Sequence, residues 1–140
     1  MTYAKKKPGT DDDLAGEGNG FVNVFDVDGN LIGRVASHGK LNSPWGLALA
    51  PAKFGKFSNR FLVGNFGDGA INAFDLATRP THRFRGQLRD SNGKKLRIDG
   101  LWGIAFGNGV MNQPTDVLSF AAGPNDEANG LYGKLEPVGN

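Results

Sequence analysis

Short apolar runs, separated by turns rich in Gly, Asp and Asn, follow one another along the whole chain. Many of these runs alternate between large and small or polar residues, a period of two that is typical of β-strands. We predict ten strands, over residues 2–4, 21–25, 31–36, 45–50, 60–65, 70–75, 82–88, 101–106, 116–121 and 131–135. The pattern therefore predicts an all-β fold.

One phrase occurs twice, as SPWGLALAP at residues 43–51 and as DGLWGIAFG at residues 99–107. In the first copy Trp45 and alternate large residues share one face of the strand, and Gly46 and alternate small residues share the other. A repeat of roughly 40 to 60 residues built from short strands indicates propeller blades. A strand with one large and one small face suits the innermost position, where adjacent blades crowd toward the axis.

The chain is accordingly predicted to be a β-propeller fragment of about two to two and a half four-stranded blades, from a ring expected to have about six. Residues 1–140 form one partial domain in this interpretation. Residues 1–36 supply strands B, C and D of one blade, residues 45–89 a complete blade, and residues 101–138 strands A, B and C of a third. The strands at the two ends of the chain do not combine into one complete blade. We therefore expect the chain to be the C-terminal portion of a longer propeller.

Composition excludes several function classes. The chain has 140 residues with 22 Gly, no Cys and a formal net charge of +2. The lack of Cys excludes disulfides, thiolate metal sites and a Cys nucleophile. Basic residues are spread along the chain, so no nucleic-acid partner is expected. Lys5, Lys6 and Lys7 are interpreted as a solvated chain end, and no apolar run is long enough to span a membrane.

Three loops at equivalent positions of the predicted blades are rich in oxygen ligands. In a propeller such loops share one face, so their carboxylates and amides would gather there. Hard cations such as Ca²⁺ bind several oxygen ligands at once, which makes calcium the candidate cofactor. The alternative is that these residues only build turns. The candidate ligands are Asp11, Asp12, Asp13, Asp68, Asn125, Asp126 and Glu127.

Four further residues are candidates for a structural or binding role. Trp45 and Trp102 open the two repeat copies at the same register, which favours structural core residues over platforms for a flat ligand. His38 and Asp99 lie on loops that are equivalent in successive blades, so they are candidate ligand-binding residues. No catalytic residue is assigned, because the sequence contains no nucleophile elbow or phosphate-binding loop.

Long phrases of the chain resemble a family of uncharacterised, mostly secreted bacterial β-propeller proteins, some from genomes with the PEP-CTERM sorting system. The phrases are GFVNVFDVDGNLIGRVAS, LNSPWGLALAPAKFGKFSNRFLVGNFGDGAINAFD, IDGLWGIAFGNG and AAGPNDEANGLYGKLEPV. The blades are also distantly similar to NHL repeats. The resemblance covers nearly the whole chain and implies secretion. The chain itself begins without a signal peptide, so as it stands its location is cytoplasmic or unknown.

We expect a non-enzymatic binding or interaction module. The alternatives are a metal-dependent hydrolase of the lactonase-like propeller type and a gene fragment without function of its own. Its partners are unknown; the candidates are further copies of the chain through self-association, or the missing blades of a parent propeller. Unpaired strand edges and apolar faces on the first and last blades would promote aggregation of the isolated chain.

Overall fold

The computed structural model describes residues 1–76 and 82–138. The strands in this part of the chain are β1 (Thr2–Tyr3), β2 (Phe21–Phe25), β3 (Leu31–Ser37), β4 (Pro44–Leu49), β5 (Phe61–Asn65), β6 (Ile71–Phe74), β7 (Phe84–Gln87), β8 (Leu101–Phe106), β9 (Leu118–Ala122) and β10 (Leu131–Leu135). A single 3-10 turn, η1 (Gly55–Phe57), is the one helical element among these residues. The all-β prediction is confirmed, and each predicted strand is found within a few residues of its expected range.

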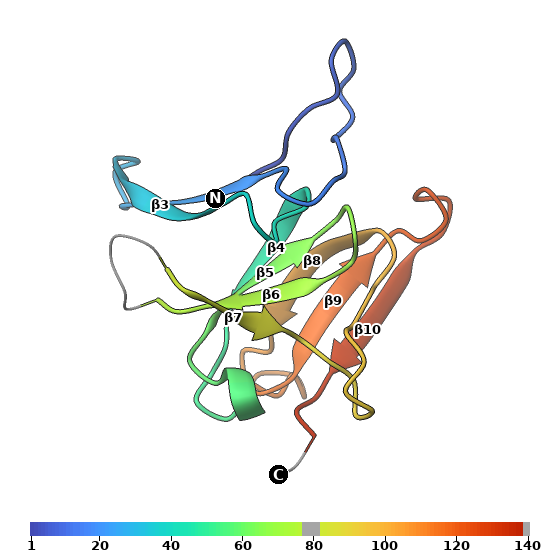
Figure 1. The fold of residues 1–140 in the computed structure, drawn as a ribbon. Helices are drawn as coiled ribbons and strands as arrows, with labels where there is room; N and C mark the ends of the chain where they lie inside the picture. Colours follow the sequence, from blue (N-terminus) through green and yellow to red (C-terminus); the bar gives the residue numbers. More distant parts are fainter. Residues whose placement is uncertain (77–81, 139–140) are drawn as a thin grey trace.

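The strands form three antiparallel sheets in simple up-and-down order, β1-β2-β3, β4-β5-β6-β7 and β8-β9-β10 (Figure 1). The sheets are open, and the described strands do not close into a ring or barrel. Residues 77–81, which belong to the predicted complete blade 45–89, lie outside the described part of the chain.

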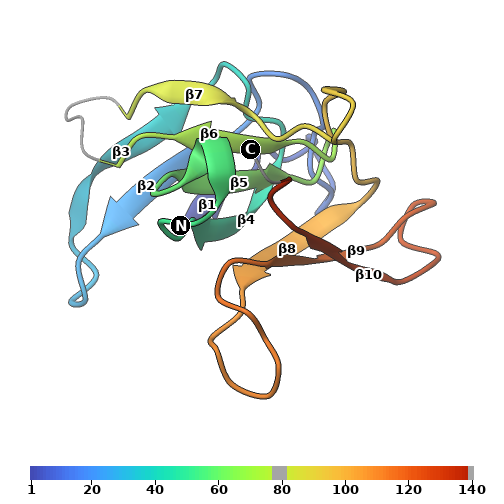
Figure 2. The same ribbon diagram turned by 90° about the horizontal axis from the view of Figure 1, so that it is seen from below.

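The four-stranded sheet lies between the other two (Figure 2). One buried cluster, with Leu62, Ile71 and Leu101 among its members, joins it to the third sheet. A second cluster, which includes Val22, Leu41 and Val63, joins it to the first sheet. Successive residues of β5 serve different clusters, because side chains alternate between the two faces of a strand. Every residue of β6 is buried, as expected for a strand covered on both faces.

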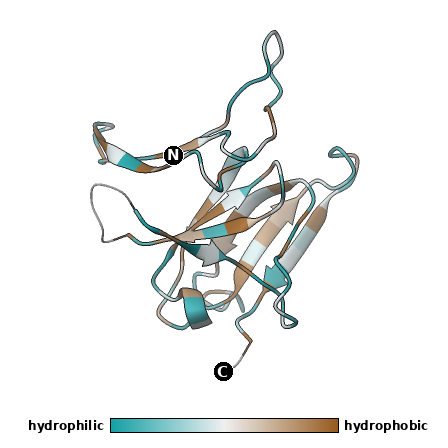
Figure 3. Ribbon diagram, viewed as in Figure 1, coloured by the Kyte–Doolittle hydropathy of each residue, from teal (hydrophilic) through white to brown (hydrophobic). Residues whose placement is uncertain are grey.

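Hydrophobic residues lie mainly on the strands, while the loops are largely hydrophilic, including the loop between β9 and β10 (Figure 3). This distribution gives the middle sheet its two apolar faces and leaves polar loops at the sheet edges.

The two Trp-Gly strands, β4 and β8, pack against each other at Gly46. A Cβ atom at Gly46 would lie 2.8 Å from the carbonyl oxygen of Trp102 and 2.9 Å from the amide nitrogen of Ile104. The small face of β4 therefore allows the backbones of the middle and third sheets to approach closely. Gly103, the equivalent residue of β8, has nothing within 4 Å of its Cβ position.

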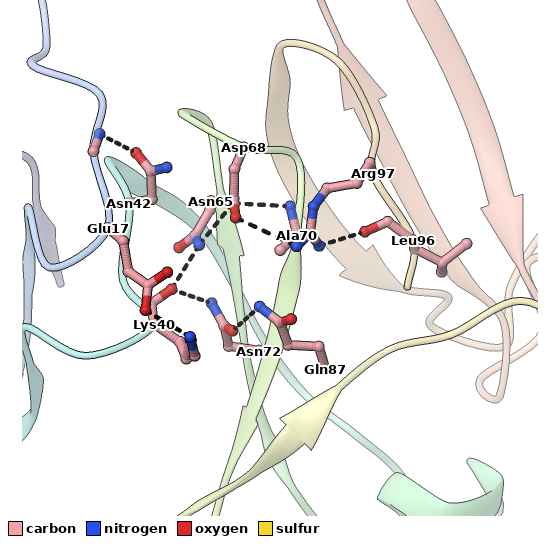
Figure 4. Close-up of polar contacts among 11 residues, drawn as sticks. Glu17, Lys40, Asn42, Asn65, Asp68, Ala70, Asn72, Gln87, Leu96 and Arg97 are labelled. Atoms are coloured by element: carbon pink, nitrogen blue, oxygen red, sulfur yellow. Dashed lines mark hydrogen bonds and ion pairs between the residues drawn. The ribbon is translucent and has the colours of Figure 1, made fainter. Parts of the chain in front are cut away.

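The segment Lys40–Pro44, which enters β4, holds loops from two sheets together (Figure 4). The Lys40 carbonyl accepts hydrogen bonds from the side-chain amides of Asn65 at 2.9 Å and Asn72 at 3.1 Å. Asn72 in turn accepts from Gln87 at 3.0 Å. Both asparagines are fully buried, so these bonds satisfy side-chain NH₂ groups that would otherwise be costly to bury, whereas the Asn65 Oδ1 atom has no hydrogen-bond partner in the described part of the chain.

Residues 41–43 of the same segment bind the long loop between β1 and β2. The Asn42 side chain accepts from the Gly16 amide at 2.7 Å, and the Leu41 carbonyl accepts from the Gly18 amide at 2.7 Å. The Lys40 ammonium also donates to Glu17 at 2.6 Å, and this hydrogen bond lowers the pKa of that carboxyl. The segment thus positions loop 5–19 relative to the middle sheet.

Gly46→Ala should lower the free energy of unfolding by about 1–3 kcal/mol, because the new methyl group overpacks the β4–β8 contact. The matched control is Gly103→Ala, at the same register of the other repeat copy, which meets open space. It should be neutral or slightly stabilising, because alanine is less flexible than glycine in the unfolded chain. Urea denaturation of both variants measures the difference. Equal destabilisation of the two would contradict the close approach at Gly46.

Candidate functional site

The most promising site is a cleft of about 460 Å³ at the loop side of the molecule, which we call the aromatic cleft. Its lining combines three aromatic rings with five carboxylates and two lysines. The lining residues are Lys6, Lys7, Asp11, Asp12, Asp13, Trp45, Phe66, Trp102, Asp126 and Glu127.

All three sheets contribute to the aromatic cleft. The lysines and aspartates come from the β1–β2 loop, Phe66 follows β5, and Asp126 and Glu127 lie in the β9–β10 loop. These three loops lie on the same side of the molecule (Figure 1). In each sheet the chain runs up one strand and down the next. The loops that follow β1, β5 and β9 are equivalent turns of their sheets, so they lie at the same end of the strands. The predicted gathering of loop carboxylates is thus seen for the first and third loops.

The three aromatic rings meet edge to face. The Trp45 and Trp102 rings have centroids 4.5 Å apart at an interplanar angle of 65°. Phe66 and Trp102 are 5.6 Å apart at 66°. Rings inclined in this way form walls that are not parallel, a favoured geometry for aromatic pairs. Trp45 is 44% exposed, so part of its ring is open to a ligand.

Asp13 fixes the orientation of Trp45. The Trp45 indole N–H donates to Asp13 Oδ2 at 3.0 Å, and the Lys6 ammonium lies 2.9 Å from Asp13 Oδ1. The Asp13 side chain is only 9% exposed, so it is engaged on both oxygens in a largely covered position. Asp12 is 70% exposed and makes a longer ion pair of 3.6 Å with Lys7.

A left-handed backbone turn carries Asp126 and Glu127. Asn125, Asp126 and Glu127 have φ angles of 58°, 51° and 66°. This region is unfavourable for residues other than glycine, and three in succession cost on the order of 1 kcal/mol each. Asp99 supports the turn, because its Oδ2 accepts from the Asn125 amide at 2.9 Å. The strain is concentrated where the loop lines the cleft.

The seven candidate calcium ligands are not all in one place. Asp11, Asp12, Asp13, Asp126 and Glu127 line the aromatic cleft, whereas Asp68 and Asn125 do not. Asp68 accepts from the Asn65 side chain at 2.9 Å and from the Ala70 amide at 3.2 Å, so it stabilises its own turn. In residues 1–76 and 82–138, no three His, Cys, Asp or Glu side chains lie close enough to hold a metal ion. Calcium binding stays a prediction.

His38 and Asp99 are not brought together. His38 lines a second cleft of about 330 Å³ between β3 and β7, with His82 and Phe84, and Asp99 is not part of it. The His38 Nδ1 atom lies 3.2 Å from the Gly18 carbonyl oxygen, and its ring stands edge-on to Phe21 at 5.5 Å. Equivalent loops of neighbouring sheets thus place these two side chains in different surroundings. A ligand held jointly by His38 and Asp99 does not fit this arrangement.

The prediction that both tryptophans are core residues is not met by Trp45. Neither tryptophan belongs to the two buried clusters, and Trp102 is half-buried. The physical reason is that β4 buries its small face against β8, while the Trp45 ring turns toward Trp102 and Asp13 at the cleft.

Sequence reasoning missed Phe66 and the two lysines of the cleft. Phe66 directly precedes the turn Gly67-Asp68-Gly69, and an aromatic residue in that position of a polar loop is the signal that could have revealed it. Lys6 and Lys7 are exposed, in agreement with the prediction of a solvated chain end, and they also pair with aspartates of their own loop. The segment Lys40–Pro44 gave no signal, because its main contribution comes from backbone carbonyls.

Comparison with known proteins finds viral relatives. Uncharacterized protein L690 of Acanthamoeba polyphaga mimivirus is 37% identical over 136 residues, which are 96% of this chain and 34% of that protein. Uncharacterized protein R648 of the same virus is 34% identical over 136 residues, 96% of this chain and 32% of that protein. The chain thus spans about a third of the length of these relatives. No family model matches the chain, and no solved structure matches it.

The assignment to a secreted bacterial propeller family is wrong, because the relatives found are mimivirus proteins. The phrases that suggested it consist largely of Gly-rich turns and of the two Trp-Gly strands, which are features of local strand and turn structure. In the described part of the chain, no helix is long and apolar enough to cross a membrane.

Asp13→Ala should release the Trp45 indole and lower the free energy of unfolding by about 1–2 kcal/mol, because it removes a covered acceptor of two donors. The Trp45 indole N–H resonance should exchange faster with water, as measured by NMR. The control is Asp12→Ala, whose exposed ion pair is worth about 0.5 kcal/mol or less. If both variants leave the Trp45 resonance unchanged, Asp13 does not position the ring.

Proposed function

We propose that the chain is part of a β-propeller that acts as a non-enzymatic binding module, with its ligand held in the aromatic cleft. The single observation that carries the proposal is the cleft itself. Strands β4 and β8 bring Trp45 and Trp102 together with Phe66, which follows β5, and loops of the first and third sheets add carboxylates to the same concave site. Concave sites with aromatic walls and a few polar groups are the usual form of small-molecule sites.

The propeller part of the proposal is supported by the repeat glycines. Gly46 accommodates the backbone of the next sheet in the chain, and the equivalent Gly103 faces open space. A fourth sheet could pack against β8 in the way that β8 packs against β4. Its backbone would then fill the open space at Gly103. The same step, repeated around an axis, generates a propeller, for which roughly four to eight blades are usual. The mimivirus relatives are about three times as long as this chain, enough to supply further sheets.

Calcium is a second candidate ligand, because five carboxylates line the cleft, but in the described part of the chain no three of them lie close enough together to hold the ion. A metal in that position would also be compatible with the hydrolase alternative. Calcium binding and hydrolase activity are both tested by titrating the chain with candidate ligands.

The open face of β8 should make the isolated chain self-associate. Light scattering on a sizing column should give a mass that rises with protein concentration, because Gly103 and Ala105, on the same face of β8, are exposed. Gly103→Arg should suppress the association by blocking the close approach of a second backbone. Gly130→Arg is the matched control, since Gly130 also meets open space but lies in a loop. A monomer at all concentrations would contradict the need for a neighbouring sheet.

Binding at the cleft is tested with the two indole N–H resonances as reporters. We expect at least one class among sugars, nucleotides, amines, carboxylic acids and Ca²⁺ to shift the Trp45 and Trp102 signals together. Organic ligands should be recovered chemically unchanged. Trp45→Ala should abolish the binding, whereas Tyr132→Ala should not, because Tyr132 is an exposed aromatic residue of β10 outside the cleft.

Two results would overturn the proposal. If no compound class shifts either indole, the cleft is not a binding site. If a bound compound is consumed, the module is an enzyme, and the hydrolase alternative replaces it.

A further inference from the structure

The geometry points to an organic cation as the ligand of the aromatic cleft, a group such as a trimethylammonium, an alkylammonium or a guanidinium. This inference rests on the proposed binding function and specifies the chemistry of the ligand. The aromatic walls, the charge, the hydrogen-bonding groups and the size of the cleft support it, and a strained turn positions two of its carboxylates.

The aromatic walls are suited to a positive charge. The face of an aromatic ring carries negative charge density, and a cation within about 6 Å of the ring centre is attracted to it. The three rings lie 4.5 Å and 5.6 Å apart as successive pairs and are inclined by 65° and 66°. A cation beside such a corner can contact more than one ring. Tryptophan, which supplies two of the three rings, is the strongest partner.

The charge of the lining has the complementary sign. Five carboxylates oppose two ammonium groups, and both lysines are already paired, with Asp13 and Asp12. In the ranges that the structure describes, Asp11, Asp126 and Glu127 form no ion pair within 4.0 Å. The cleft therefore repels anions and attracts cations.

The hydrogen-bonding groups also favour a ligand that brings its own donors. Carboxylates accept hydrogen bonds only, the indole N–H of Trp45 is used by Asp13, and the ammonium groups of Lys6 and Lys7 pair with Asp13 and Asp12. A neutral sugar would need donors as well as acceptors from the protein. An ammonium or guanidinium group needs acceptors alone, and a trimethylammonium group needs only charge and apolar contact.

The size of the cleft separates an organic cation from a metal ion. Its volume of about 460 Å³ lies within the usual range for small-molecule sites, roughly 300–1,000 Å³. A metal ion would occupy the carboxylates and leave the aromatic walls uncovered. An alkylated cation covers the rings and faces the carboxylates at the same time.

The strained turn at residues 125–127 places two of the carboxylates. Its three consecutive positive φ angles are held by the Asp99 bond to the Asn125 amide. Strained backbone of this kind is commonly retained where it positions a functional group. Here it positions Asp126 and Glu127 in the lining of the cleft, to which loop 5–19 contributes Asp11, Asp12 and Asp13.

The test compares tetramethylammonium with its neutral counterpart, tert-butyl alcohol, by NMR titration of the intact chain. We expect tetramethylammonium to shift the Trp45 indole signal and to bind at least about tenfold more tightly than the alcohol. The double variant Asp126→Asn, Glu127→Gln should weaken binding of the cation about tenfold and leave binding of the alcohol unchanged. Glu136→Gln, which removes a charge from an exposed residue outside the cleft, should change neither.

Two further arms identify the source of the cation. A short peptide containing trimethyl-lysine that binds more tightly than tetramethylammonium would assign the site to a side chain of a protein partner. Equal binding of the two would assign it to a free small molecule.

Equal affinity for tetramethylammonium and tert-butyl alcohol would overturn the cation inference while leaving a binding cleft. Shifts produced only by a neutral sugar or by Ca²⁺ would overturn it in the same way. The absence of any shift with every probe would overturn the proposed function as well. If Trp45→Ala does not fold, Trp45→Phe keeps the ring face and should retain weaker cation binding.

Discussion

The structure depends on the hydrogen bonds that the segment Lys40–Pro44 makes to its surroundings. Its Lys40 carbonyl accepts two buried side-chain amides from the middle sheet, and residues 41–43 bind loop 5–19. The Ser43 carbonyl accepts from the Phe66 amide at 2.9 Å, which fixes the ring that follows β5. Most of these bonds join residues that are far apart in the sequence. They hold the loops of different sheets together, so that these loops line one cleft. Each buried amide that lost its partner would carry the full penalty of desolvation.

Packing adds a second constraint, which is the close approach of backbones at β4 and β8. The middle sheet is covered on both sides, and its two apolar faces arise from strict alternation along β5 and β6. On one side the approach is so close that only glycine fits at position 46. The aromatic pair Trp45–Trp102 is a direct result, since strands that lie this near bring their equivalent tryptophans into edge-to-face contact.

Strand positions and the loop side of the fold could be read from the sequence because both depend on local signals. Apolar alternation defines the strands, Gly-rich turns separate them, and simple up-and-down connection puts Asp11–Asp13 and Asp126–Glu127 at one edge. The role of Lys40–Pro44 could not be predicted from the sequence. Its contacts are made mainly by backbone carbonyls, which every residue carries, so no residue type marks them. The separation of His38 from Asp99 and the exposure of Trp45 depend on the tilt between sheets, which no local pattern encodes. Shared turn phrases misled the family assignment for the same reason: they report local geometry.

Because the cleft is lined by residues of all three sheets, binding of the proposed ligand would be coupled to the docking of the sheets. Loop 5–19 reaches the cleft only while the first sheet is docked, and the 123–129 loop only while the third sheet is docked. A ligand that touches both loops binds the assembled form alone, and by mass action it stabilises that form. At a hundredfold excess over its dissociation constant the gain is about 2.7 kcal/mol, comparable to a disulfide. In a chain without cysteine, the proposed ligand would thus take the role of the covalent cross-link that the sequence lacks.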